Sequence, residues 1–392
     1  MSSPDLTEAE FTAVRNVLAT RYLSIGPQAD ALEKALAAYV GTAHAATVSS
    51  GTAGLHLCVV AAGIGEGDLV ITTPFSFVAS ANCVLYERAV PVFVDVDPLT
   101  GNVDPELVGA CADALADGGE GARDWLPPAL RGRAPRGSLK ALLPVHAFGQ
   151  PADMDPLTAV ARRHGLTVIE DACEAIGAEY KGRKAGTLGD AGVFAWYPNK
   201  QMTTGEGGAI VTDRGEFDVL FRSLRNQGRD VFDAWLRHSR LGYNYRLDEM
   251  SAALGLVQLR RLEELLDRRA RVARWYDERL SGHELVETPR VGPATTRMSW
   301  FVYVVRINRP ARRDAVLELL GRRGIPSRPY FTPIHLQPLY AERFGHRAGD
   351  FPVTEGLGEV SLALPFSSVM TEGQVDEVCR HLAAVAVAPA AR

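Results

Sequence analysis

The chain has 392 residues, of which 46% are hydrophobic and 23% charged, the composition of an ordinary soluble globular protein. Its formal net charge of −5 argues against nucleic acid as the main partner. No uninterrupted apolar stretch reaches the length of a membrane span, and the first residues show no basic segment followed by an apolar core. We therefore expect a cytoplasmic protein that works on neither membranes nor nucleic acid.

The five cysteines are scattered along the chain, and none of them occurs in a CxxC spacing. An odd number of isolated thiols is typical of reduced cysteines in a cytosolic protein, and is not typical of a disulfide framework or a zinc site. We therefore expect no metal. Cys173 follows an acidic pair, but a small buried core residue is its simplest interpretation.

The apolar spacing predicts two N-terminal helices, over residues 7–21 and 29–40, the second closed by Gly41. Short apolar runs and helical patterns then alternate. The strands expected from these runs are residues 45–48, 69–72, 90–94, 142–146, 166–170, 192–196 and 209–211. The helices expected between them include residues 50–62, 76–86 and 152–164. This alternation argues for an α/β fold with a largely parallel sheet and right-handed crossovers.

Two stretches differ from this alternation. Residues 112–137 are rich in Gly, Ala, Arg and Pro, which predicts an insertion to which we assign no function. Residues 248–280 predict one long helix, and a strand at 300–307 and a helix at 312–324 follow it. The simplest division is a large domain over residues 1–249 and a smaller α+β domain over residues 250–392.

Three places along the chain carry residues suited to chemistry. Ser50-Gly51-Thr52 opens a helix after a strand, where backbone N–H groups and the helix dipole favour a phosphate, although a plain serine cap is an equal alternative. Glu170 and Asp171 end a buried strand, at the edge where open α/β sheets bind ligands. Asp171 there can keep a ring nitrogen protonated or simply cap a helix.

Lys200 stands among aromatic residues, a proline and a glycine-rich turn, where its amine is partly desolvated. Such an amine suits attack on a carbonyl, while a surface lysine is the plain alternative. The order of the features favours the first interpretation. In chain order the sequence has a helix start suited to a phosphate, the aromatic Phe77, Asp171 and then Lys200. This order is typical of an enzyme that uses pyridoxal 5′-phosphate (PLP).

The chain also resembles a known family over nearly its whole length. The motifs that carry the resemblance are Gly26-Pro27, Ser50-Gly51-Thr52, residues 73–77, residues 91–95, Glu170-Asp171-Ala172, Lys200 with residues 204–208, residues 242–246, and residues 335–338. Together they are similar to the DegT/DnrJ/StrS family of PLP-dependent sugar aminotransferases. The resemblance implies the aspartate aminotransferase type I fold, with a mixed, mostly parallel sheet.

The resemblance also implies roles for single residues. Lys200 would be the Schiff-base lysine and proton carrier, and Asp171 would hold the pyridine nitrogen. The implied contacts to the rest of the cofactor come from Phe77 stacked on the ring and from the amides of Gly51 and Thr52 at the phosphate. Asn244 would reach the phosphate from the neighbouring subunit, so that a homodimer would share its active sites.

Other positions are implied less directly. Glu174 stands where the family often has Gln or His beside the cofactor's 3-oxygen, to which a carboxylate can donate only when protonated. Ala195 replaces a serine that often touches the phosphate. The residues expected at the substrate are Arg246, Tyr330 and His335.

The expected reaction moves an amino group from an amino acid, L-glutamate, to a keto sugar that is linked to a nucleotide, in aminosugar, antibiotic or glycan biosynthesis. A keto cyclitol or another acceptor without a nucleotide is an open alternative, as is a PLP-binding regulator without turnover. Sugar dehydration is disfavoured, because that branch of the family replaces the lysine with histidine and this chain keeps Lys200.

Overall fold

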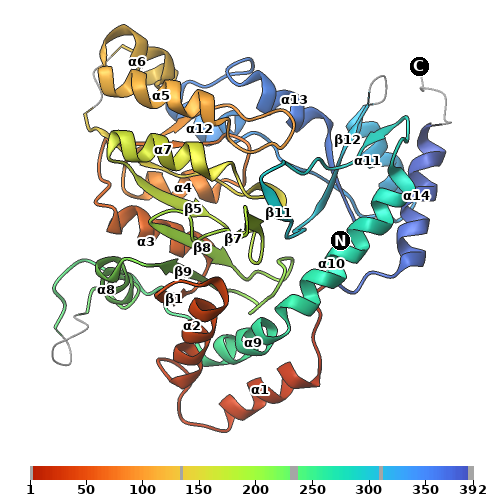
Figure 1. The fold of residues 1–392 in the computed structure, drawn as a ribbon, viewed down its shortest axis with the longest axis horizontal. Helices are drawn as coiled ribbons and strands as arrows, with labels where there is room; N and C mark the ends of the chain where they lie inside the picture. The colour runs from red at the N-terminus through yellow and green to blue at the C-terminus, as the bar shows by residue number, and fades with distance from the viewer. Residues whose placement is uncertain (1–2, 133–135, 230–236, 309–311, 387–392) are drawn as a thin grey trace.

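The computed structural model describes residues 3–132, 136–229, 237–308 and 312–386. Residues 133–135, which belong to the expected insertion, lie outside these ranges. The described residues contain a seven-stranded, a four-stranded and a three-stranded sheet (Figure 1). None of their helices is both long and apolar enough to cross a membrane.

The seven-stranded sheet has the order β1-β9-β8-β5-β4-β2-β3. Its strands are β1 (His44–Val48), β2 (Leu69–Thr72), β3 (Val90–Phe93), β4 (Leu139–Leu142), β5 (Thr167–Asp171), β8 (Ala191–Ala195) and β9 (Gly208–Thr212). The ladders from β3 through β8 are parallel, whereas β9 runs antiparallel to both β1 and β8. The predicted mixed, mostly parallel α/β sheet is thereby confirmed.

Helices cover both faces of this sheet, and each face has its own apolar core. The helices on one face are α3 (Gly51–Ala61), α4 (Ala79–Tyr86) and α8 (Gly215–Leu224). Those on the other are α2 (Pro27–Val40), α5 (Pro105–Asp117), α7 (Met154–His164) and α9 (Glu249–Arg260). Since both faces are covered, most strand residues are buried and apolar, as in parallel strands generally, and the polar exceptions include Glu170 and Asp171 at the end of β5.

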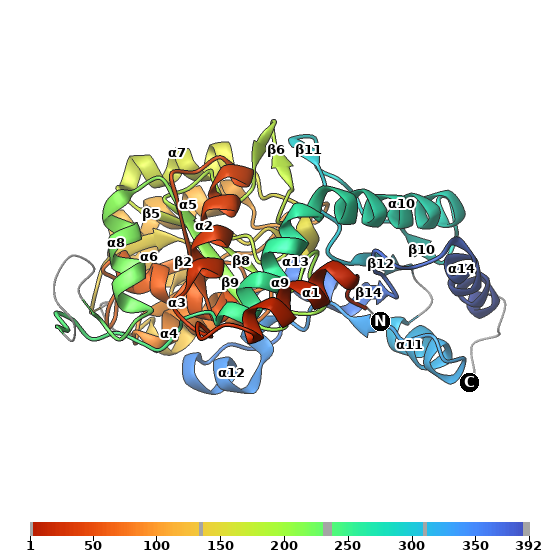
Figure 2. The ribbon, with the colours of Figure 1, turned by 90° about the horizontal axis from the view of Figure 1, so that it is seen from below.

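The four-stranded sheet is antiparallel and has the order β10-β12-β14-β13. Its strands are β10 (Val286–Glu287), β12 (Tyr303–Ile307), β13 (Arg328–Pro329) and β14 (Ser361–Leu364). The helices packed on it are α10 (Leu262–Leu280), α11 (Arg313–Arg322) and α14 (Glu372–Ala386). Figure 2 shows α10 running from the region of α9 toward this second sheet, so it connects the two halves of the molecule.

Smaller elements complete the fold. They are α1 (Glu8–Leu18), α6 (Gly119–Trp125), η1 (Pro128–Leu130), η2 (Ala147–Gly149), η3 (Ile334–Leu336), α12 (Pro338–Phe344), α13 (Pro352–Val360) and the sheet of β6 (Glu179–Tyr180), β7 (Arg183–Lys184) and β11 (Thr295–Arg297). The expected insertion forms the end of α5 with α6 and η1. The division at residue 249 stays a prediction, and α12 packs on Phe93 of the first sheet.

Several expected elements begin or end up to three residues away from their predicted bounds, and two differences have a clear physical reason. The strand expected at residues 142–146 is β4, three residues earlier, because Pro144 has no N–H to donate to a ladder. The helix expected over 248–280 is interrupted at Arg261, which separates α9 from α10. The guanidinium of Arg261 is held there by the carboxylates of Asp5 and Glu10 at 2.8 and 2.7 Å.

Candidate active site

Lys200 lies in the loop between β8 and β9, at the carboxyl edge of the parallel strands. The loop is closed at its base by the Trp196 N–H, which donates to the Gly207 carbonyl at 2.9 Å. The Lys200 Nζ lies 3.4 Å from a carboxylate oxygen of Glu174 and 3.9 Å from the ring centre of Phe301. With only 13% of its side chain exposed, the amine is largely desolvated, as the sequence predicted.

Asp171 is the last residue of β5, next to β8 in the sheet. One of its carboxylate oxygens accepts a hydrogen bond from the Ser80 hydroxyl of α4 at 2.7 Å, and the other accepts from the Cys173 N–H at 3.2 Å. The Ser76 hydroxyl lies 2.8 Å from that of Ser80. The carboxylate is therefore fixed in place at the strand end, which is what a partner for a ring nitrogen requires.

The neighbouring acid, Glu170, has a different role. It is fully buried, and it accepts hydrogen bonds from the N–H groups of Gly186 and Gly189 at 2.8 and 2.6 Å. The His146 Nε2 lies 2.8 Å from the same carboxylate. These partners occupy Glu170 inside the fold, so of the acidic pair only Asp171 belongs to the site.

Glu174 is buried beside Lys200 and accepts a hydrogen bond from the Phe148 N–H at 3.0 Å. Burial raises the pKa of its carboxyl above the ordinary value of 4.5, and the charge of Lys200 opposes this shift. Burial and the nearby Glu174 together raise the pKa of Tyr330 to about 12. Glu174 therefore interacts electrostatically with both Lys200 and Tyr330.

The N-terminus of α3 borders the site. The Ser50 hydroxyl caps the helix by accepting from the Ala53 N–H at 3.1 Å, and Gly51 and Thr52 supply the first helical amides, which have no partner within the helix. A Cβ atom at Gly51 would lie only 2.7 Å from both the Ala195 Cβ and the Cys173 Sγ. The absence of a side chain therefore lets these amides lie against the ends of β5 and β8.

Phe77 and Asn244 are the exposed members of the predicted cofactor set. Phe77 is 64% exposed and precedes α4, so its ring is not packed into the core. Asn244 is exposed on a segment that bridges to Asn226. Both residues are available to a bound molecule or to another chain.

Arg246 and His335 are not brought to Lys200 within the chain. Arg246 donates to the side-chain oxygens of Asn226 and Gln227 at 2.9 and 2.7 Å, and it lines a separate cavity of about 350 Å³. His335 has no exposed surface, and its Nε2 lies 2.9 Å from the Glu355 carboxylate. Burial lowers the pKa of the His335 imidazole.

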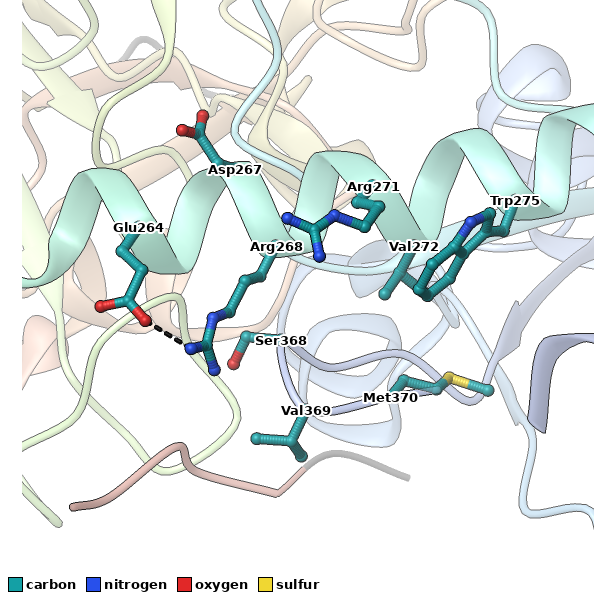
Figure 3. Close-up of a pocket in the computed structure, with 9 residues that line it drawn as sticks. All are labelled: Glu264, Asp267, Arg268, Arg271, Val272, Trp275, Ser368, Val369 and Met370. Atoms are coloured by element: carbon teal, nitrogen blue, oxygen red, sulfur yellow. Dashed lines mark ion pairs between the residues drawn. The ribbon is translucent and has the colours of Figure 1, made fainter. Parts of the chain in front are cut away.

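A cavity of about 790 Å³ also lies elsewhere (Figure 3). It runs along α10 and is lined by Glu264, Asp267, Arg268, Arg271, Val272, Trp275, Ser368, Val369 and Met370. Arg268 pairs with Glu264 inside it, and none of its lining residues belongs to the predicted site. Among the described residues no group of three or more His, Cys, Asp or Glu side chains could hold a metal ion.

Sequence reasoning missed several residues around Asp171 and Lys200. Ser76 precedes α4 and Ser80 lies in its first turn, so no local pattern indicated that Ser80 reaches Asp171 and Ser76 reaches Ser80. Phe301 and Arg269 had no signal, because they come from segments of the second half that only the fold brings to the lysine.

Comparison with known proteins identifies the chain. The model of the DegT/DnrJ/EryC1/StrS aminotransferase family matches residues 4–383. The chain belongs to this family. It is 40% identical to GDP-perosamine synthase of Caulobacter vibrioides over 393 residues, which cover 99% of this chain and 98% of that protein.

Solved structures of the family agree in fold. A DegT/DnrJ/EryC1/StrS aminotransferase from Brucella abortus superposes with a TM-score of 0.86 at 32% identity, covering 97% of this chain and 96% of that one. DesV of S. venezuelae gives a TM-score of 0.85 at 33% identity, covering 97% and 95%. The predicted family, enzyme class and PLP dependence are therefore confirmed: the protein is a PLP-dependent aminotransferase.

The residues of this chain also fit PLP on structural grounds. A fixed carboxylate, a desolvated amine and free helix amides meet at one sheet edge, and they match the ring nitrogen, the aldehyde and the phosphate of the cofactor. Gly51 allows the first turn of α3 to lie against Ala195 and Cys173, which brings the helix amides to the sheet edge that carries Asp171 and Lys200.

Proposed function

We propose that the enzyme transfers an amino group from L-glutamate to a keto sugar carried by a nucleotide, in the biosynthesis of an aminosugar. The observation that carries this proposal is the desolvated Lys200 amine, set between Glu174 and Phe301 at the sheet edge where Asp171 ends β5. The nucleotide-linked acceptor is supported by the 40% identity to a protein named GDP-perosamine synthase. Cytoplasmic location and a place in antibiotic or glycan biosynthesis stay predictions.

Each residue of the site has a proposed task. When bound, PLP supplies an electron-withdrawing ring that stabilises negative charge at the donor's Cα. Asp171 would accept a hydrogen bond from the protonated ring nitrogen, and the Gly51 and Thr52 amides would bind the phosphate. Lys200 Nζ would hold the cofactor at its aldehyde carbon, and as a free amine it would take the proton from the donor's Cα.

The remaining assignments concern the rim. Phe77 would cover the ring, and Asn244 of the neighbouring subunit would reach the phosphate, so that the working unit would be a homodimer. Glu174, whose pKa is raised by burial, would donate to the cofactor's 3-oxygen when protonated. Of the residues predicted at the substrate, Tyr330 would contact it beside Glu174. Arg246 and His335 are left out, because they are hydrogen-bonded to Asn226 and Gln227 and to Glu355.

Replacement of Lys200 by Ala tests the proposal. The purified wild-type protein, incubated with PLP and reduced with borohydride, should carry the cofactor covalently at residue 200, as seen by peptide mass spectrometry. Lys200→Ala should carry none and should release no 2-oxoglutarate from glutamate. A trapped cofactor in Lys200→Ala would show that another amine does the work.

The acceptor is tested separately with the aminated cofactor form of the wild-type enzyme. Nucleotide-linked keto sugars and keto cyclitols are added one at a time, and return of the PLP absorption is recorded. Turnover of a nucleotide-linked sugar supports the proposal. Turnover of a cyclitol alone would refute the sugar acceptor, and no release of 2-oxoglutarate at all would indicate a binding protein.

A further inference from the structure

Arg269 is a buried cation on α10 that the proposed chemistry does not use. Only 2% of it is exposed, and among the described residues no carboxylate charge offsets the burial. Burial lowers the pKa of its guanidinium to about 10, so it stays charged at neutral pH. A buried charge is costly unless hydrogen bonds satisfy it, and the partners of Arg269 therefore indicate what it does.

Its partners are backbone carbonyls from two distant segments. One terminal nitrogen donates to the carbonyls of Lys200 and Asn199 at 2.8 and 3.4 Å. The other donates to those of Phe301 and Trp300 at 3.1 and 3.3 Å. The planar guanidinium thus joins the loop that carries the lysine to the segment whose Phe301 ring touches the lysine's Nζ.

The side chain of Gln201 also joins the lysine loop to the segment before Phe301 through hydrogen bonds. The Gln201 amide nitrogen donates to the Glu174 carbonyl at 2.5 Å and to the Ser299 carbonyl at 2.9 Å. Two side chains therefore join the segment around Phe301 to the loop that carries Lys200: those of Arg269 and Gln201. Of these ties, only that of Arg269 bonds the backbone of Lys200 itself.

We propose that Arg269 is a positioning residue for amino transfer: its guanidinium fixes the backbone of Lys200 against the Trp300–Phe301 segment, so that Nζ meets the cofactor and the donor's Cα in a reactive geometry. This inference rests on the proposed role of Lys200. A displacement of a reacting group by about 1 Å costs on the order of 100-fold in rate, so a loosened lysine loop should be measurable in kcat.

The decisive variant is Arg269→Lys, which keeps the charge but lacks the planar fork that spans two pairs of carbonyls. In the holoenzyme, kcat for the glutamate half-reaction should fall by roughly 10- to 100-fold, and KM for glutamate should change by less than about threefold. In cofactor-free protein, the rate at which an amine-reactive reagent labels Lys200 should also change, as read by mass spectrometry. Wild-type kcat and labelling in Arg269→Lys would overturn the proposal.

A second variant separates positioning from folding. Arg269→Ala leaves a space in which methylguanidinium can donate to the same carbonyls, and millimolar amounts should restore at least part of the lost kcat. Arg279→Met, which removes the ties of α10 to Glu372 and Asp376, is the stability control. The proposal is refuted if Arg279→Met and Arg269→Ala have the same melting temperature, lose the same kcat, and methylguanidinium does not restore it. The loss of kcat would then follow from reduced stability.

Arg271→Met is the matched charge control, since Arg271 lies on the same helix but lines the cavity of Figure 3. It should leave kcat and Lys200 labelling unchanged, and a loss equal to that in Arg269→Lys would contradict the proposal. Lys200→Ala keeps the two claims distinct. If Lys200→Ala still traps the cofactor, the proposed role of the lysine is refuted. If Lys200→Ala traps none but the Arg269 variants keep wild-type kcat, only the positioning role of Arg269 is refuted.

Discussion

Glu174 is held between opposing electrostatic influences. Burial raises the pKa of its carboxyl above 4.5, although the Lys200 ammonium 3.4 Å away favours the charged form. Between 4.5 and the raised value, the folded protein therefore binds more protons than the unfolded chain. The stabilisation from this group is fully present below pH 4.5 and is lost as the pH rises through the folded pKa.

Glu174→Gln should remove this loss. The amide oxygen can still accept from the Phe148 N–H, but it carries no charge to bury. The melting temperature of the cofactor-free variant, relative to the wild type, should therefore rise by a few degrees as the pH is raised from 4.5 to 8. Glu264→Gln, an exposed change on α10, should show no such trend. A difference between Glu174→Gln and wild type that is the same at every pH would contradict the argument.

The side chains around Lys200 show what the sequence can and cannot predict. Asp171 and Gly51 were placed correctly at a strand end and a helix start, because a short apolar run and a following small-residue turn are local signals. Arg269 and Phe301 come from α10 and the segment before β12, far along the chain. Their approach to Lys200 depends on tertiary packing, and no local pattern encodes it.

The N-terminus of α3 carries the second prediction, at the scale of an element. Gly51→Ala would bring a Cβ to 2.7 Å from atoms of Ala195 and Cys173, so the first turn of α3 must move away from the sheet edge. We expect a loss of about 1–3 kcal/mol in the free energy of unfolding. Weaker PLP binding, measured as a higher Kd by titration of the apoprotein, should accompany it because the phosphate amides move with the turn.

A helical glycine elsewhere supplies the control. Gly356 lies in α13, and a Cβ there would meet nothing within 4 Å. Gly356→Ala should therefore keep the PLP affinity and stabilise the protein by up to about 1 kcal/mol, the usual gain of Ala over Gly inside a helix. Unchanged PLP affinity in Gly51→Ala would show that the close approach of α3 to the sheet does not serve the phosphate.

The surface of the whole molecule bears on its assembly. Several large apolar side chains stand more than half exposed, near the N-terminal helix, the site and the segment before Asn244: Phe11, Leu18, Ile25, Phe77 and Leu241. Exposed apolar residues that stand singly are common on monomers, so their number alone identifies no interface. The proposed homodimer therefore has to be tested through the site that it would share.

A shared site makes a prediction that only the assembled molecule can test. If Asn244 contributes to the active site of the neighbouring subunit, a Lys200→Ala protomer still supplies an intact Asn244 to its partner. When that partner carries Asn244→Ala and an intact Lys200, its own site is complete. Such a mixed dimer contains one complete site and one site with both changes. Each variant alone should have low activity, since every site in it lacks one of the two residues.

Equal amounts of the two variants, unfolded together and refolded with PLP, should give half mixed dimers and therefore about a quarter of the wild-type activity. Mixing after separate refolding, without exchange of subunits, is the control and should give no recovery. If Asn244 instead acts within its own chain, no mixed dimer contains a complete site, and co-refolding would yield no more activity than the two variants apart. The recovered fraction therefore decides whether the phosphate is bound by one chain or by two.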